Sequence, residues 1–365
     1  MADAPFDTLG QPAATSQLAS MLAAGRPHHG LVFEGPSGVG KFRCAVGFAQ
    51  VLLCLDPPPG RPAEACNTCQ SCRLLDGPPG EAGANHPDLH VVTKELSRFS
   101  EDAGTRSRKL TSIPVEVLRE HLLEPAHRSP QLGPRKAFVL DEAELLNPAG
   151  QNALLKTLEE PPPGTFLVLV TSSAERLLPT VRSRCQRVGF QPLPDAVVDA
   201  WFSEHHPGLP AATRGWVTRF ADGSLGRAEL ALDRGLLAWG NSIGPLLSAA
   251  ASGRAVPELA DACTEAIKGY ADAWVKDHAN ASKEAANRQA ADLLAHLFAR
   301  EARTHLEAAA RGCPVDDPIA NERRVAGPLA AIAAVDTYRE RLGSSVNLGL
   351  ATAELALGYA AAWRG

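Results

Sequence analysis

The stretch Gly35-Pro36-Ser37-Gly38-Val39-Gly40-Lys41-Phe42 decides the fold that we expect for this chain. It matches the phosphate-binding pattern G-x-x-x-x-G-K-[ST] at every position except the last. An apolar strand candidate at 31–34 precedes it, and residues 44–53 follow with apolar side chains at helical spacing. Strand, glycine-rich loop and helix in this order bind phosphate, because the loop's N–H groups and the helix N-terminus favour an anion.

The residues of the motif have distinct expected roles. Gly35, Gly38 and Gly40 would let the backbone approach phosphate oxygens, and Lys41 would reach the β and γ phosphates. Phe42 stands where Ser or Thr normally ligates Mg²⁺, and a benzyl side chain cannot coordinate a hard cation. The motif therefore predicts a nucleotide-binding fold with a defective metal site. The alternative is a glycine turn that matches by chance.

Composition is typical of a globular protein. The 365 residues are enough for two or three domains, and 45% of them are hydrophobic against 21% charged. The net charge of −5 gives no overall basic signal for nucleic acid, so only a local patch stays open. Residues 1–6 contain neither a basic region nor an apolar core, so we expect no signal peptide.

The most apolar long stretch, residues 346–363, contains Asn347, Thr352 and Glu354. We therefore interpret it as a buried helix and not as a membrane span. These features predict a cytoplasmic protein with no membrane partner. In that compartment the eight cysteines are expected to be thiols or metal ligands rather than disulfides.

Four cysteines follow the helix of the phosphate loop at spacings typical of a metal site. They are Cys54, Cys66, Cys69 and Cys72. The C-x-x-C-x-x-C run places three sulfur atoms around one point, and Cys54 can complete a tetrahedron. Four thiolates with no open position predict a structural Zn²⁺, with an iron–sulfur cluster or free thiols as alternatives. The proline- and glycine-rich flanks cannot form a regular core, so a metal would hold this insertion together.

A second motif, which is weak by itself because acids after strands are common, gains weight from its position about 100 residues after the phosphate loop. Residues 136–140 form an apolar strand candidate that ends in Asp141 and Glu142. The first acid would hold Mg²⁺ and the second would polarise the attacking water. A further strand candidate at 165–170 ends in Thr171-Ser172-Ser173, which would either sense a γ-phosphate or simply end the strand.

Alternating strands and helices up to about residue 190 predict a mostly parallel sheet with helices on both faces. We expect helices at 17–24, 113–123 and 147–160, short helices over 195–237, and long helices from there to residue 365. Residues 96–109 carry charges of both signs, typical of a solvated loop; the alternative is a DNA contact by Arg106, Arg108 and Lys109. His86 precedes a proline and is interpreted as a turn residue rather than a metal ligand.

Together these motifs resemble one family. The phosphate loop, the four cysteines and His86-Pro87-Asp88 are followed in order by Asp141-Glu142-Ala143-Glu144, Asn152-Ala153-Leu154-Leu155-Lys156-Thr157-Leu158-Glu159-Glu160-Pro161-Pro162 and Ser183-Arg184-Cys185. This order is similar to that of the clamp-loader subunits of bacterial DNA polymerase III, which are AAA+ ATPases. The resemblance is dense over residues 6–190 and looser to the end of the chain.

The resemblance implies an α/β fold with three parts. Residues 1–191 would form an AAA+ P-loop parallel sheet domain, with a zinc-binding insertion at about 54–72. Residues 192–240 would form a small helical lid, and residues 241–365 an all-α collar that serves oligomerisation.

Two kinds of subunit share these motifs: the ATP-hydrolysing gamma/tau motor and the non-hydrolysing delta prime subunit. Phe42 favours delta prime, as does a chain that stops after one collar-sized helical region. Gly226 would align with the sensor arginine of the motor, although the adjacent Arg227 leaves a second alignment open. We therefore expect a delta prime subunit without activity of its own. The alternatives are the motor, and a zinc-bearing AAA+-like protein with an unrelated partner.

The resemblance also implies partners. They are the gamma/tau and delta subunits, a ring-shaped sliding clamp that is reached indirectly, and primer-template DNA that is reached through the complex. Arg184 would project into the ATP site of a neighbouring motor, where its planar guanidinium can pair two phosphate oxygens. A surface salt bridge is the alternative role for Arg184. The chain itself would bind ATP and Mg²⁺ weakly or not at all.

Overall fold

The computed structural model describes residues 6, 8–75, 86–106, 112–277, 282–311, 318–342 and 347–364. The chain divides into two compact units. Unit 1 comprises Met1–His205 and Gly223–Arg227, and unit 2 comprises His206–Asp222 and Ala228–Gly365. The predicted lid, 192–240, contributes to both units, and the three-part division of the chain stays a prediction.

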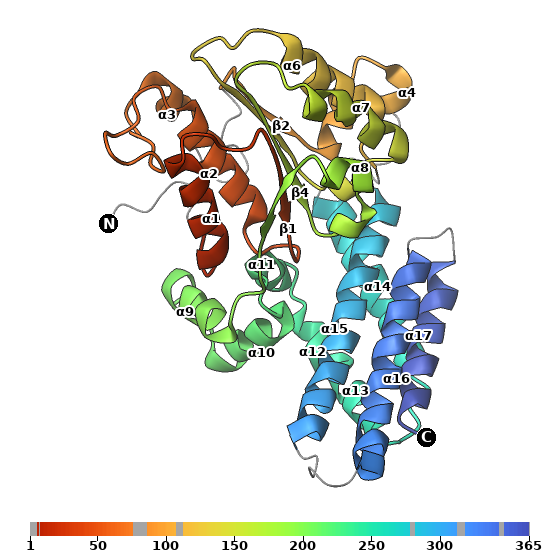
Figure 1. Ribbon diagram of the computed structural model, residues 1–365. Helices are drawn as coiled ribbons and strands as arrows, with labels where there is room; N and C mark the ends of the chain where they lie inside the picture. The colour runs from red at the N-terminus through yellow and green to blue at the C-terminus, as the bar shows by residue number, and fades with distance from the viewer. Residues whose placement is uncertain are drawn as a thin grey trace. The chain divides into compact units, whose positions relative to one another are not determined.

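Unit 1 is built on a five-stranded parallel sheet with the strand order β2-β3-β4-β1-β5 (Figure 1). Its strands are β1 (Gly30–Glu34), β2 (Leu89–Val92), β3 (Lys136–Leu140), β4 (Thr165–Thr171) and β5 (Gln186–Gly189). All strand pairs are parallel, which confirms the predicted sheet. The carboxyl ends of the strands therefore meet at one edge, where open α/β sheets bind ligands.

Helices cover both faces of the sheet, because alternate strand residues point in opposite directions. Phe33 and Val139 pack with one set of helices, and Val32 and Phe138 pack with the other. Figure 1 shows helices on both sides of the sheet. The first set is α1 (Pro12–Ala23), α2 (Lys41–Leu53) and α3 (Gln70–Leu75). The second set is α5 (Val115–Leu118), η2 (Arg119–Leu123), α6 (Glu124–His127), α7 (Pro148–Glu159) and α8 (Pro179–Arg182). Unit 1 also contains η1 (Lys94–Phe99), α4 (Ala103–Arg106), η3 (Ala143–Leu145), η4 (Ala174–Arg176) and α9 (Asp195–His205).

Three predicted elements of unit 1 differ from the structure. The first helix begins at Pro12 and not at residue 17, because proline fits the first turn of a helix. The helix predicted at 113–123 begins at Val115, since Ile113 instead forms a bridge to Leu146, and it continues through π-helical η2 into α6. The loop predicted at 96–109 contains most of η1 and all of α4. Arg108 and Lys109 lie outside the described residues.

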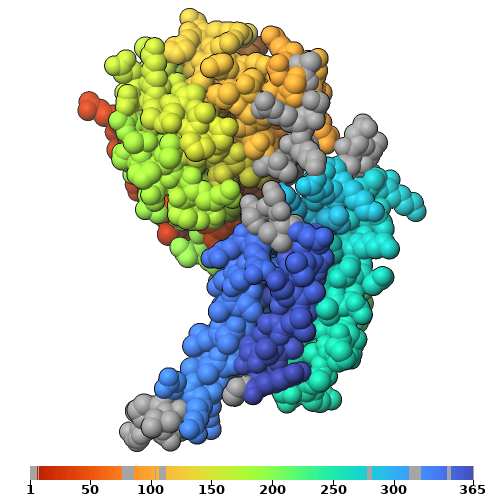
Figure 2. All heavy atoms as spheres, turned by 90° about the vertical axis from the view of Figure 1, so that its right-hand side faces the viewer, coloured from red at the N-terminus to blue at the C-terminus, as the bar shows by residue number. Residues whose placement is uncertain are grey.

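The regular elements described in unit 2 are all helices, as predicted. Its helices are α10 (Ala211–Ala221), α12 (Leu237–Ser242), α13 (Gly244–Ala251), α14 (Leu259–Asp277), α15 (Lys283–Arg311), α16 (Pro318–Leu342) and α17 (Leu348–Ala362), while α11 (Leu225–Asp233) spans the boundary between the units. Leucine, alanine and aromatic side chains from these helices form one core. The bundle of α14 to α17 keeps α16 and α17 side by side (Figure 1, Figure 2).

The helix α17 is apolar on two faces but buried on only one. Leu355 and Tyr359 are buried in the core of unit 2, whereas Leu350 and Leu357 are 59% and 68% exposed. The prediction of a buried helix at 346–363 is therefore correct for one face and wrong for the other. Among the described helices, none combines the length and the apolar character that crossing a membrane requires.

Candidate functional site

The phosphate loop connects β1 to α2 at the carboxyl edge of the sheet. Gly35, Gly38 and Gly40 have φ angles of 143°, 74° and 96°, a backbone that L side chains rarely adopt. A Cβ atom on Gly35 would lie 2.3 Å from the carbonyl oxygen of Phe190. The glycines of the motif are therefore required by the conformation of the loop and by its close packing.

The side chain of Lys41 is folded back onto its own loop. It is buried, and its Nζ atom donates to the carbonyl oxygens of Gly35, at 2.7 Å, and of Pro36. Burial lowers the pKa of Lys41 to about 8, and the carboxylates of Glu144 and Asp141 oppose this shift. The ammonium group that would meet a phosphate is therefore already bound by backbone acceptors.

A later segment of unit 1 covers the loop. The N–H group of Gly226 donates to the carbonyl oxygen of Gly38 at 3.0 Å. A Cβ atom on Gly38 would lie 2.3 Å from Ser224 Oγ, and one on Gly226 would lie 3.0 Å from Gly38 Cα. The two backbones thus touch directly. Gly226 therefore contacts the phosphate loop itself, and its alignment with a sensor arginine, for which Arg227 is the second candidate, stays a prediction.

The acidic residues after β3 have partners within the chain. Asp141 accepts a hydrogen bond from the N–H group of Glu142 at 2.9 Å, and burial raises the pKa of Asp141 to about 6. Glu142 has a φ angle of 49° and pairs with Lys94 at 2.7 Å. Glu144 accepts hydrogen bonds from the hydroxyl and the N–H group of Ser172, at the end of β4. The polar residue Ser172 at the end of β4 therefore contacts the carboxylate of Glu144.

Phe42 has a packing role at the position of the missing hydroxyl. Its side chain is half-buried and packs against the core that α1 and α2 form with the sheet. The benzyl group therefore contributes apolar contacts where the motif normally supplies an oxygen ligand.

The four predicted metal ligands converge beyond the C-terminal end of α2. One sulfur atom from each of Cys54, Cys66, Cys69 and Cys72 lies within 4.8 Å of the others. The N–H group of Cys66 points at Cys54 Sγ, and that of Cys69 points at Cys66 Sγ, each at 3.3 Å. Backbone N–H groups, that of Thr68 foremost, lower the pKa of Cys66 to about 6, which favours the thiolate. The group could hold one metal ion.

His86 supports this cluster without belonging to it. Ser71 Oγ donates to the carbonyl oxygen of Leu53 at 2.8 Å and lies 2.9 Å from His86 Nε2. Because the hydroxyl proton is already used, Nε2 must carry the proton of the imidazole, and Nδ1 accepts the N–H group of Asp88 at 3.0 Å. These buried bonds connect the end of α2, the cysteine-bearing helix α3 and the start of β2.

Arg184 lies in the turn between α8 and β5. Its guanidinium pairs with Glu159 at 2.5 Å and donates to the carbonyl oxygen of Thr180 at 2.9 Å. The side chain is 35% exposed, so it can be reached from solvent. The structure thus brings the loop glycines, Lys41 and Asp141 together, and it keeps Arg184 and the four cysteines apart from them as separate sites.

Comparisons with known proteins match the sheet-bearing part of the chain. Residues 10–194 match the family model described as "DNA polymerase III, delta subunit". The DNA polymerase III subunit delta' of Pseudomonas aeruginosa is 36% identical over 184 residues, which cover 50% of this chain and 49% of that protein. The DNA polymerase III subunit gamma/tau of Mycobacterium bovis is 32% identical over 194 residues, which cover 53% of this chain and 30% of that protein.

The chain spans about half the length of the curated delta' relatives that it matches. A solved gamma subunit-related protein from Thermotoga maritima covers 95% of this chain and 98% of its own length. It is 17% identical to this chain, with a TM-score of 0.39.

Proposed function

We propose, because the chain belongs to the family described as "DNA polymerase III, delta subunit", that it is a delta prime-type clamp-loader subunit that does not hydrolyse ATP. In this role it is a fixed part of an assembly that loads a sliding clamp onto primed DNA in the cytoplasm. Its direct partners are the gamma/tau and delta subunits. Primer-template DNA is reached through the complex, and no membrane is involved.

The observation that carries this proposal is the closed phosphate loop. Lys41 donates hydrogen bonds to two carbonyl oxygens of the loop, the N–H group of Gly226 contacts Gly38, and Phe42 packs against the core. Hydrolysis requires the lysine on the phosphates and a hydroxyl on Mg²⁺. Each of these groups is engaged elsewhere or missing, which supports a subunit that keeps the fold of a motor without its turnover.

The second part of the proposal concerns Arg184. Its side chain is 35% exposed at the edge strand β5 and is held by Glu159. If Arg184 left the Glu159 carboxylate and paired with the phosphate oxygens of ATP bound to a neighbouring subunit, its charge would stay paired. A cation delivered in this way stabilises the charge that develops during phosphoryl transfer. We therefore assign Arg184 as an arginine finger that acts in trans.

The third part of the proposal concerns the cysteine cluster. Four convergent sulfur atoms with N–H groups pointed at them fit a tetrahedral structural site with no position open for substrate. We propose that Cys54, Cys66, Cys69 and Cys72 hold Zn²⁺. Bound metal would fix the segment between α2 and α3 against the sheet.

One reconstitution tests the function. The purified chain alone should show no ATP hydrolysis above background. Mixed with gamma/tau, delta, sliding clamp and primed DNA, it should enter a stable complex and be needed for clamp loading. Robust hydrolysis by the isolated chain would favour a motor, and failure to assemble would contradict the clamp-loader role.

Elemental analysis of protein purified without chelator should find one zinc per chain, whereas iron with visible absorbance would contradict the zinc assignment.

A further inference from the structure

Lys94, the first residue of η1, pairs with Glu142 at the carboxyl edge of the sheet. Its Nζ atom lies 2.8 Å from Oε1 and 2.7 Å from Oε2, so it engages both oxygens of the carboxylate. The side chains of Lys94 and Glu142 are 26% and 39% exposed. Surface ion pairs are common and contribute little to stability, so the pair alone indicates no function. The way in which the two residues are held supplies the further observations.

The ladder between β2 and β3 brings the two residues together. Val92 pairs with Leu140 in parallel register, and the N–H group of Asp141 donates to the carbonyl oxygen of Val92 at 2.9 Å. Lys94 lies two residues after Val92, and Glu142 lies two residues after Leu140. Because parallel strands end at the same edge of a sheet, the two segments leave it as neighbours. The register of the sheet therefore sets this ion pair.

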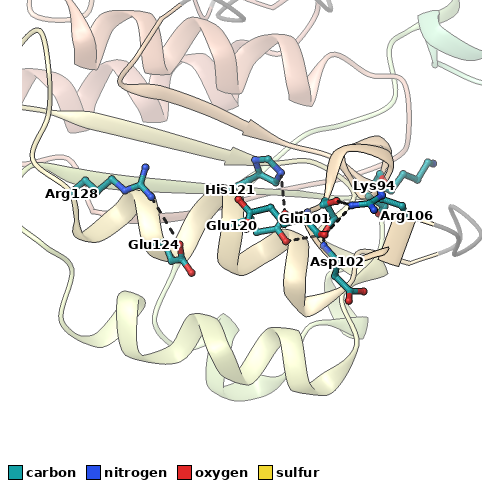
Figure 3. A network of polar contacts seen from close by, with 10 residues as sticks. Lys94, Glu101, Asp102, Arg106, Glu120, His121, Glu124 and Arg128 are labelled. Carbon is teal, nitrogen blue, oxygen red and sulfur yellow. Dashed lines mark hydrogen bonds and ion pairs between the residues drawn. The ribbon is translucent and has the colours of Figure 1, made fainter. Parts of the chain in front are cut away.

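The backbone that carries Lys94 is fixed by hydrogen bonds. Ser97 Oγ donates to the carbonyl oxygen of Lys94 at 2.7 Å. Beyond the end of η1, Arg106 of α4 donates to the carbonyl oxygens of Ser100, at 2.7 Å, and Glu101, at 2.9 Å (Figure 3). An ammonium group on an ordered backbone loses less conformational entropy when it pairs with a carboxylate. Lys94 is thus built to stay at Glu142.

The backbone of Glu142 is fixed as well. Its φ angle of 49° is uncommon for a residue with a side chain and persists only where the surroundings hold it. The N–H group of Glu142 donates to Asp141 Oδ1 at 2.9 Å, and its carbonyl oxygen accepts the N–H group of Leu145 at 2.8 Å. The direction in which the carboxylate leaves the chain is therefore determined by the fold.

Glu142 is also the residue that the motif assigns to the attacking water. In hydrolysis the oxygen of water bonds to the γ-phosphorus of ATP, the bond from that phosphorus to the β–γ bridging oxygen breaks, and the proton of the water is released with ADP and phosphate. The carboxylate must accept a hydrogen bond from this water to orient it. Both oxygens of Glu142 already accept from Lys94, so a water has to compete with an ammonium group.

We propose that Lys94 is a positioning residue that keeps Glu142 from orienting a water, an inference that rests on the proposed function. This block to hydrolysis is separate from those at Lys41 and Phe42, because it acts on the water and not on the phosphates or the metal. A chain whose phosphate loop regains a ligand for Mg²⁺ should therefore bind ATP and still not hydrolyse it. ATP would be a bound ligand of that chain and not its substrate.

Single-turnover hydrolysis of radiolabelled ATP by the isolated chain separates the two blocks. Phe42→Ser should stay at background. Phe42→Ser combined with Lys94→Met should hydrolyse ATP at least about tenfold faster than Phe42→Ser alone, because the freed carboxylate can act on the water. The affinity of the two variants for a fluorescent ATP analogue should be the same. Equal rates for the two variants, including two rates at background, would overturn the proposal. Phe42→Thr supplies the same ligand if Phe42→Ser does not fold.

Two further variants separate the release of Glu142 from a merely structural effect. Lys94→Arg keeps a cation that can pair with both oxygens, so together with Phe42→Ser it should keep the rate at background. Glu142→Gln, added to Phe42→Ser and Lys94→Met, should remove the gain in rate. A gain that survives Glu142→Gln, or that appears with Lys94→Arg, would contradict the role of Lys94. Robust hydrolysis by the unmodified chain would instead contradict the proposed function, so the two failures are distinguishable.

Discussion

Single side chains determine what the phosphate loop can bind. A nucleotide would have to draw Lys41 away from two carbonyl oxygens and find a replacement for the hydroxyl that Phe42 lacks. The motif predicts the course of the backbone, because glycines at fixed spacing permit few other turns. It does not predict the partners of Lys41, since those depend on side-chain conformation in the folded state.

Replacement of Phe42 separates metal binding from packing. Phe42→Ser restores a ligand for Mg²⁺, so we expect Mg²⁺-dependent binding of a fluorescent ATP analogue to improve. The half-buried ring is lost, which should lower the free energy of unfolding by about 1–3 kcal/mol in urea titrations. Phe42→Ala is the control, because it removes the same ring without adding a hydroxyl. Equal nucleotide binding by the two variants would contradict the role assigned to position 42.

Burial of Asp141 should make stability depend on pH. Its pKa is raised to about 6, so between about pH 4 and pH 6 the folded protein holds a proton that the unfolded chain has lost. The charged carboxylate therefore destabilises the fold as pH rises through this window, and fully above it. We expect Asp141→Asn to raise the free energy of unfolding by about 1–3 kcal/mol at pH 7.5, and by much less at pH 4.

Urea titrations at the two pH values measure this difference for Asp141→Asn. Glu142→Gln is the control, because it removes a charge near Asp141 but also breaks the ion pair with Lys94, so its gain should be smaller than that of Asp141→Asn. A gain for Asp141→Asn that is the same at both pH values would show that the effect does not come from ionisation.

At the scale of elements, the contact between the start of α11 and the phosphate loop depends on two glycines. Gly226→Ala places a methyl group 3.0 Å from Gly38 Cα, so one of the two backbones must shift by a few tenths of an ångström. We expect this close contact to cancel the stability that alanine adds to a helix. We also expect a fluorescent ATP analogue to bind the phosphate loop more tightly, because the covering segment shifts. Gly269→Ala in α14 has open space and should stabilise unit 2 by about 0.5–1 kcal/mol. A stabilising Gly226→Ala with unchanged nucleotide binding would argue against a covering role.

The cysteine module is joined to the sheet by hydrogen bonds and by packing. Ser71 is fully buried, and Cys72 and Leu75 share a core with Phe48 of α2. Ser71→Ala breaks the link between Leu53 and His86 and leaves buried groups without a partner. We expect Zn²⁺ to be released to a chromogenic chelator several times faster, with the metal content at the start unchanged. Ser203→Ala, on the exposed side of α9, is the control and should release metal at the original rate.

Local patterns predict elements better than they predict the contacts between them. The strands β1, β3 and β4 were predictable because apolar runs end at turn residues, and Asn147 marks α7 by capping Gly150 at 2.8 Å. The roles of Glu144 and Lys94 were not predictable, because their partners are distant in sequence. The contact of Ser224 with the phosphate loop was also not predictable, because nothing in the sequence around Ser224 signals a close approach to Gly38.

At the scale of the whole molecule, the fold assigned to unit 1 and the role predicted for unit 2 are supported by different observations. The family match covers residues 10–194, within unit 1, so the nucleotide-binding fold has support from both sequence and structure. Unit 2 has a well-packed helical core, and α17 leaves Leu350 and Leu357 exposed. The family resemblance predicts that unit 2 contains a collar that joins subunits, and assembly of the reconstituted complex tests this prediction.

Arg184 is the residue that we propose to act on a neighbouring subunit, and its removal is the most direct test of the proposed function. Arg184→Ala should leave folding, zinc content and assembly intact, because the partners of its side chain, Glu159, Thr180 and Ser183, all lie at the surface. Arginines delivered in trans are worth on the order of 10³–10⁵ in rate at their own site. Because only one of several sites loses its arginine, the fall in ATP hydrolysis and clamp loading by the complex should be smaller.

Two further variants make the result specific. Arg184→Lys should restore the rate in part, because an ammonium keeps the charge but lacks the bidentate fork. Glu159→Gln frees Arg184 from its partner within the chain and should not slow the complex. If the Arg184→Ala complex hydrolyses ATP and loads clamps at the full rate with clamp and primed DNA present, Arg184 forms only a surface ion pair. A loss in Glu159→Gln equal to that in Arg184→Ala would instead assign the effect to the ion pair, because both variants break it.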